Sequence, residues 1–230
     1  MCARVPPPSP NSPAPLCLSA ICLLFTLNVT AYEAPLNPPS LHEAWTLGQR
    51  NDQGTANFLV EYIKEIAEKT GGEPRIAEIE ILTPFTQVVD ESRQNPSNFS
   101  EQKAADSYHK RGDTIVVSVQ LMLPAAYPRQ EDSPAAAPPA SQQNAPLRPE
   151  NFWQSFHFNL KQHGKVIPIR STQSKPIYSA STKDAPAVLD GATVWLQYDS
   201  KDVASEQTVV EVITPGSRTI TATFDLGKLR

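Results

Sequence analysis

Few residues of this sequence have the types and spacing that catalysis requires. All three cysteines lie near the N-terminus, and no G-x-S-x-G segment is present to expose a nucleophilic serine. One of the four histidines, His42, is followed by Glu43, but Thr46 stands where a zinc-binding H-E-x-x-H helix needs its second histidine. We therefore predict no catalytic residue, no bound metal and no cofactor, which favours a protein that is not an enzyme.

Acidic side chains near the ends of predicted strands suggest a calcium site. Asp190, Asp199 and Asp202 lie where the loops of a β-sandwich gather, and Ca²⁺ is bound by several carboxylate oxygens. The alternative is that these segments are turns, in which aspartate accepts hydrogen bonds from its own backbone. We favour the turns and keep calcium as the second interpretation.

Two tryptophans and a histidine suggest a binding face. Trp153 and His157 share one side of a predicted strand, and Trp195 occupies an equivalent position in a later strand. Aromatic rings on a polar sheet face stack on sugars or contact a protein partner. The alternative is that a helix or a neighbouring loop covers these rings, which would make them structural.

The first 31 residues have the features of a secretory signal peptide. An apolar stretch over residues 16–29 leads to Val29-Thr30-Ala31, where the small or short residues match a signal-peptidase site. The stretch is shorter than the roughly 20 residues that a membrane-spanning helix needs. We therefore predict cleavage and a secreted or periplasmic protein with no membrane span; an uncleaved membrane anchor is the alternative.

The positions of the cysteines are linked to this prediction. Cys2, Cys17 and Cys22 are the only cysteines, so cleavage after Ala31 removes all of them. We expect the exported chain to form no disulfide and to depend on its hydrophobic core for stability.

Charge and length limit the classes of partner and the number of domains. The 230 residues carry 20 basic and 24 acidic side chains, a formal net charge of −4. No basic stripe is present that would bind phosphate backbones, so a nucleic-acid partner is excluded. The length fits one large domain or two small ones.

The N-terminal half of the mature chain is predicted to contain an arm, helices and strands. Prolines in residues 32–53 predict an extended arm. Residues 54–70 have the apolar periodicity of one amphipathic helix, with Asp52 as its cap. The other elements expected here are strands over 77–81, 85–89 and 114–123, and a short helix over 101–110 that Ser100 caps.

The C-terminal half is predicted to be all β after a linker. The composition of residues 125–150, rich in proline and alanine, is typical of a disordered loop. The strands expected after it cover 152–161, 166–170, 193–199, 208–214 and 218–226. Residues 54–124 and 151–230 together predict a mainly β protein with one or two helices, an antiparallel sandwich of immunoglobulin-like type.

These features favour an exported, non-catalytic β-sandwich module that binds a protein or a glycan. One alternative is an extracytoplasmic hydrolase whose acidic and histidine side chains come together from distant strands. Another is a structural accessory domain of the cell envelope. A pKa-perturbed carboxylate in a cleft would favour the hydrolase, and an aromatic surface without such groups would favour binding.

Overall fold

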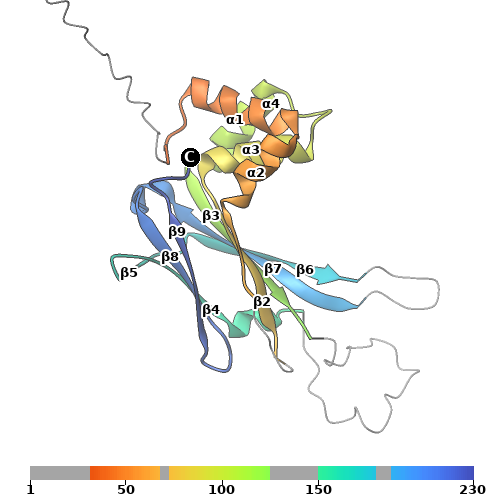
Figure 1. The fold of residues 1–230 in the computed structure, drawn as a ribbon, viewed down its shortest axis with the longest axis vertical. Helices are drawn as coiled ribbons and strands as arrows, with labels where there is room; N and C mark the ends of the chain where they lie inside the picture. The colour runs from red at the N-terminus through yellow and green to blue at the C-terminus, as the bar shows by residue number, and fades with distance from the viewer. Residues whose placement is uncertain (1–31, 68–72, 125–149, 180–187) are drawn as a thin grey trace, which may run out of the picture.

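A computed structural model describes residues 32–67, 73–124, 150–179 and 188–230. The predicted signal peptide and nearly all of the predicted linker lie outside these residues. Within them the chain is mainly antiparallel β-structure in two sheets, with four α-helices (Figure 1). The prediction of a mainly β, antiparallel protein is confirmed, and the predicted one or two helices are corrected to four.

The first sheet has five strands and the second has four, and every strand pair is antiparallel. The first sheet has the order β1 (Ile63–Glu65), β2 (Arg75–Leu82), β3 (Thr114–Met122), β7 (Leu189–Asp199) and β6 (Ser171–Tyr178). The second sheet has the order β5 (Lys165–Ile167), β4 (His157–Gln162), β8 (Gln207–Ile213) and β9 (Thr219–Asp225).

One hydrophobic core lies between the two sheets. Alternate residues of β3, such as Val117 and Val119, point into it from the first sheet. Val212 of β8 and Phe224 of β9 enter the same core from the second sheet. Because this core contains residues from both sides of the 125–149 segment, the two halves of the chain form a single sandwich-like arrangement.

Four helices gather at one end of the sheets (Figure 1). They are α1 (Pro38–Arg50), α2 (Gln53–Val60), α3 (Pro84–Gln94) and α4 (Glu101–Arg111). Their buried side chains, including Ala44, Val88 and Tyr108, form a second and smaller core. No helix in the described part of the chain is long and apolar enough to cross a membrane.

Two of these helices lie in segments that were predicted to have extended backbone. The arm predicted over 32–53 contains α1, and the strand predicted over 85–89 lies within α3. Each helix begins with proline in its first turn, after a capping residue, Asn37 or Thr83, whose side chain accepts a backbone N–H. Proline is favourable there because the first helical N–H groups have no partner inside the helix.

The helix predicted over 54–70 is shorter in the structure. Asp52 caps α2 as predicted, accepting a hydrogen bond from the Thr55 N–H at 3.0 Å. The helix ends at Val60, and the chain continues into β1, with Tyr62 buried in the sandwich core. The apolar residues 62, 63 and 66 therefore lie in a turn and along an edge strand, and they do not form further turns of the helix.

Four of the C-terminal strands, β5, β7, β8 and β9, lie where strands were predicted, whereas β6 was not predicted and the first strand begins later than expected. Residues Phe152–Ser155 form the short 3-10 helix η1, and β4 begins only at His157. The next turn has positive φ at both His163 (48°) and Gly164 (76°), as a type I′ hairpin between β4 and β5 requires. A second 3-10 helix, η2 (Ser200–Asp202), follows β7.

Arg230 ties the sandwich to the helices. Its guanidinium pairs with Glu43 of α1, at 2.7 Å for one of the two hydrogen bonds, and lies over the ring of Phe85 in α3, 4.6 Å from the ring centre. Its backbone N–H donates to the Tyr62 hydroxyl at 2.8 Å, and its carbonyl accepts from the hydroxyls of Tyr62 and Thr83. Contacts from one residue thus connect α1, α3 and the start of the first sheet.

Two buried tyrosines should respond oppositely to removal of their hydroxyls. Tyr62 and Tyr198 are both almost fully buried, and burial raises the pKa of each. The Tyr62 hydroxyl has hydrogen bonds to Arg230, whereas the Tyr198 hydroxyl has no partner among the described residues. We expect Tyr62→Phe to lower the free energy of unfolding by about 2 kcal/mol and Tyr198→Phe to raise it by about 1 kcal/mol. Denaturant unfolding of both variants tests this, and changes of the same sign would contradict it.

Candidate functional site

The structure does not bring the predicted binding-face residues together. Trp195 lies in the middle of β7 and is half-buried on the outer face of the first sheet, between Ser118 of β3 and Gln173 of β6. His157 is exposed at the start of β4, on the outer face of the second sheet. Trp153 lies in η1 and packs against the core. Trp195 and His157 are thus on opposite sides of the sandwich.

The three aspartates of the calcium hypothesis are also separated. Asp190 is the second residue of β7 and Asp199 the last, so about 30 Å of extended strand lies between them. Asp199 accepts a hydrogen bond from Arg170 at 3.0 Å, and Asp202 lies in η2. Within the described ranges, no three His, Cys, Asp or Glu side chains are grouped so that they could hold a metal ion.

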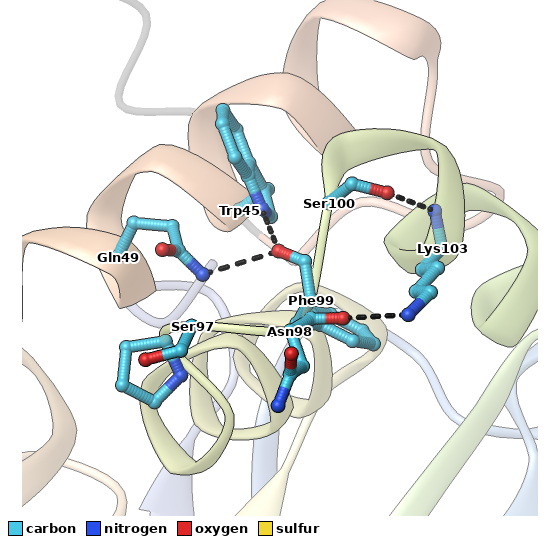
Figure 2. Close-up of a pocket in the computed structure, with 8 residues that line it drawn as sticks. Trp45, Gln49, Ser97, Asn98, Phe99, Ser100 and Lys103 are labelled. Atoms are coloured by element: carbon cyan, nitrogen blue, oxygen red, sulfur yellow. Dashed lines mark hydrogen bonds between the residues drawn. The ribbon is translucent and has the colours of Figure 1, made fainter.

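An open pocket of about 430 Å³ lies instead among the helices (Figure 2). It is formed by α1, by the loop between α3 and α4, and by the first turn of α4. Its lining residues are Trp45, Gln49, Pro96, Ser97, Asn98, Phe99, Ser100 and Lys103. We call it the Trp45 pocket.

The carbonyl of Phe99 holds the two sides of this pocket together. Trp45 and Gln49 are four residues apart on α1 and therefore lie on one face of the helix. The indole N–H of Trp45 donates to the Phe99 carbonyl at 2.8 Å, and the side-chain amide of Gln49 donates to the same oxygen at 3.2 Å (Figure 2). The half-buried Trp45 ring is thus fixed in orientation, with part of its surface open to solvent.

The loop side of the pocket is held by the beginning of α4. Ser100 caps this helix as predicted, accepting from the backbone N–H of Lys103 at 3.3 Å. The Lys103 ammonium reaches back to the carbonyl of Asn98 at 2.8 Å (Figure 2). The exposed residues Ser97 and Asn98 lie on the same rim.

The chemistry of the Trp45 pocket suits binding. Its lining has an aromatic ring, amides and hydroxyls, and its one ionisable side chain is Lys103. No carboxylate, imidazole or thiol lines it; the Ser100 hydroxyl accepts from the helix backbone and the Lys103 ammonium donates to the Asn98 carbonyl. Trp45 and Gln49 were not predicted as site residues because residues 32–53 were predicted to be an extended arm. Their i, i+4 spacing is the sequence feature that places both side chains on one face of a helix.

Among the described residues, the carboxyl group with the strongest perturbation is that of Glu80, half-buried on the outer face of β2. Burial, together with the charges of Asp90 and Glu78, raises its pKa to about 7 against the lowering effect of Arg93. Arg93 is itself paired with Asp90 at 2.8 Å, which limits its effect on Glu80. Glu80 does not line the Trp45 pocket.

Comparison of the chain with protein-family models, with curated proteins and with solved structures found no match in any of the three.

Proposed function

We propose that this chain is a non-catalytic binding module that holds a glycan in the Trp45 pocket. The observation that carries the proposal is the half-exposed Trp45 ring, fixed by the Phe99 carbonyl at the wall of an open polar pocket. An aromatic face packs against the C–H face of a sugar ring, while amides and hydroxyls bind its hydroxyl groups. Gln49, Ser97 and Asn98 supply such groups around the ring. A protein ligand is the alternative within the same proposal.

We also propose that the sandwich is of the immunoglobulin-like class. The order β2-β3-β7-β6 corresponds to strands A-B-E-D, and β5-β4-β8-β9 corresponds to C′-C-F-G. In this correspondence the helices α3 and α4 are an insertion between strands A and B, and the Trp45 pocket belongs to that insertion and to α1. Binding residues carried on segments added to a rigid scaffold are common.

Export is part of the same proposal. Residues 1–31 have the signal-peptide pattern described above, and cleavage after Ala31 would make Tyr32 the first residue. A glycan-binding module would then meet its ligand outside the cytoplasm. N-terminal sequencing of the exported protein should begin at or near Tyr32, and a different start would overturn this part.

The hydrolase alternative rests on one feature, the raised pKa of Glu80. A carboxyl group that is neutral near pH 7 is suited to proton donation, but a catalytic acid must also reach its substrate. Because Glu80 is half-buried next to the charged side chains of Asp90 and Arg93 of α3 and lies outside the Trp45 pocket, binding remains the better proposal. The structural accessory role has no separate observation in its favour.

Trp45→Ala tests the proposal against a matched tryptophan. We expect the full chain to bind members of an array of immobilised oligosaccharides, and Trp45→Ala to weaken that binding by at least about tenfold, which is about 1.4 kcal/mol. Trp195→Ala removes the same ring from a half-buried site on the first sheet and should leave affinity unchanged. Titration of the best array ligand into each folded variant measures the difference. Absence of any glycan ligand, or equal affinities for both variants, would overturn the proposal.

A further inference from the structure

The four edge strands of the two sheets differ in how they are protected against pairing. Two edges, β1 and β5, are only three residues long. The third, β6, carries Lys175 and Pro176 and has a register shift. Short length, lysine, proline and irregular register all hinder the addition of another strand. The fourth edge, β9, has seven residues, neither lysine nor proline, and an uninterrupted register with β8.

The backbone of β9 presents free hydrogen-bonding groups on its outer side. At one end of the β8–β9 pair, the Thr214 N–H donates to the Arg218 carbonyl. At the other end, the Leu226 N–H donates to the Glu206 carbonyl. The residues on the β9 side of these bonds, Arg218 and Leu226, are even-numbered. In an antiparallel pair, bonded and non-bonded residues alternate. The odd-numbered residues Thr219, Thr221 and Thr223 therefore direct their N–H and C=O groups away from β8, and no described strand pairs with them.

The outer face of β9 is polar but carries no charge between its two ends. Thr219, Thr221 and Thr223 are exposed on the outer face, and Ile220, Ala222 and Phe224 are buried on the inner face. No charged residue occurs between Arg218 and Asp225. Threonine, isoleucine and phenylalanine are also among the residues that favour strands.

We propose that β9 pairs antiparallel with β9 of a second copy of this chain, which joins two four-stranded sheets into one. Full overlap of the strands places the two-fold axis at Ala222. Thr221 then faces Thr223 of the other copy, and Ile220 faces Phe224, so that outer and inner faces both match. Ala222 faces itself in a non-hydrogen-bonded pair, where strands approach most closely and a small side chain is required.

The near-symmetry of the strand about Ala222 favours a second copy over an unrelated extended peptide. The residues on either side of it are threonines, and large apolar residues occupy the next positions. At the ends of the overlap, Asp225 faces Thr219, so no two like charges are opposed in the pair. The interface lies on β9, none of whose residues lines the Trp45 pocket, and it does not depend on the glycan proposal.

Charge substitutions on the outer face of β9 test both the partner and the register. One variant combines Thr221→Lys with Thr223→Lys, and a second combines Thr221→Glu with Thr223→Glu. In the proposed register each variant opposes like charges twice across the axis, so each alone should be a monomer. A mixture of the two opposes lysine to glutamate and should recover the dimer. Thr221→Val with Thr223→Val keeps β-branched, uncharged side chains and should remain dimeric.

Sedimentation velocity of the full chain and its variants, each checked for unchanged circular dichroism, gives the result. The proposal is supported if the unmodified chain and the valine variant are dimers and each charged variant alone is a monomer. The mixture of the two charged variants must also form a dimer. An unmodified chain that stays monomeric at the highest concentration overturns it, and would leave the β9 edge for an extended segment of another protein. Dimers that persist in both charged variants place the contact elsewhere, and a mixture that stays monomeric overturns the register.

Discussion

Gly48→Ala is expected to lower the free energy of unfolding by about 3 kcal/mol, the upper part of the range for overpacking a core. Gly48 lies on the face of α1 that contacts α3, where the two helices approach closely. A Cβ atom at this position would lie 2.3 Å from the Val89 carbonyl oxygen and 2.6 Å from the Ser92 Cβ. Because one of these neighbours is backbone, α1 and α3 must move apart to admit a single methyl group.

The same substitution should disrupt the Trp45 pocket. Ser92 of α3 donates its hydroxyl to the Trp45 carbonyl at 2.9 Å and accepts from Gln49 at 3.1 Å. Separation of α1 from α3 therefore displaces the two α1 residues that hold the Phe99 carbonyl. We expect loss of glycan binding together with the loss of stability.

Gly54→Ala is the matched control for this prediction. A Cβ at Gly54 would meet the Asp52 Oδ1 at 3.1 Å and the Arg50 guanidinium at 3.4 Å, so the Asp52 cap has to shift by only a few tenths of an ångström and no backbone has to move. Alanine in a helix is also favoured over glycine by up to about 1 kcal/mol, so this variant should be unchanged or slightly more stable. Denaturant unfolding followed by circular dichroism compares the two variants. Equal stability of Gly48→Ala and the parent chain would show that α1 and α3 are not in close contact.

Glu80→Gln is expected to increase stability above pH 7 and to have little effect at pH 4. Burial raises the pKa of Glu80 from 4.5 to about 7, so between these values the folded state binds more protons than the unfolded state. The free energy of unfolding contributed by Glu80 therefore falls as pH rises through this window. The shift corresponds to about 3 kcal/mol at pH 8. Glutamine keeps the shape of the side chain and removes the charge.

The measurement is the difference in unfolding free energy between Glu80→Gln and the parent chain from pH 4 to pH 8. Taking the difference removes the contributions of titrating groups that do not interact with Glu80, whereas the charges of Asp90 and Glu78 remain coupled to it. Glu73 is exposed, and Glu73→Gln is the control, with no comparable pH dependence expected. A constant difference across the range would mean that Glu80 is solvated in the folded chain.

The strands and the α4 helix could be predicted because their signals are local. In β9, apolar and threonine residues alternate strictly, and the structure buries every second residue. In α4, Ser100 precedes the helix and Gly112, with φ of 76°, follows it. These patterns depend on the period of the backbone and on residues that cap or end an element, so no knowledge of distant contacts is required.

The helices α1 and α3 were not predicted because proline has two opposite meanings. It ends a helix from within, yet it is favourable in the first turn. In Asn37-Pro38 and Thr83-Pro84, the residue before proline is a helix-capping residue. That residue indicates that the proline begins a helix and does not end one. In addition, α1 has few strongly apolar residues, and contact with α3 through Gly48 supplies the burial that its own sequence does not suggest.

By itself, the sequence determined the β-rich class, the alternation of buried and exposed residues in most strands, and the local caps at Asp52 and Ser100. Only the tertiary structure decided which side chains share a surface. It placed Trp195 and His157 on opposite faces of the sandwich, and it joined Trp45 to the loop at Phe99, 54 residues later. The physical reason is that periodicity assigns a residue to a face of its own element, whereas a site depends on how the faces of distant elements pack together.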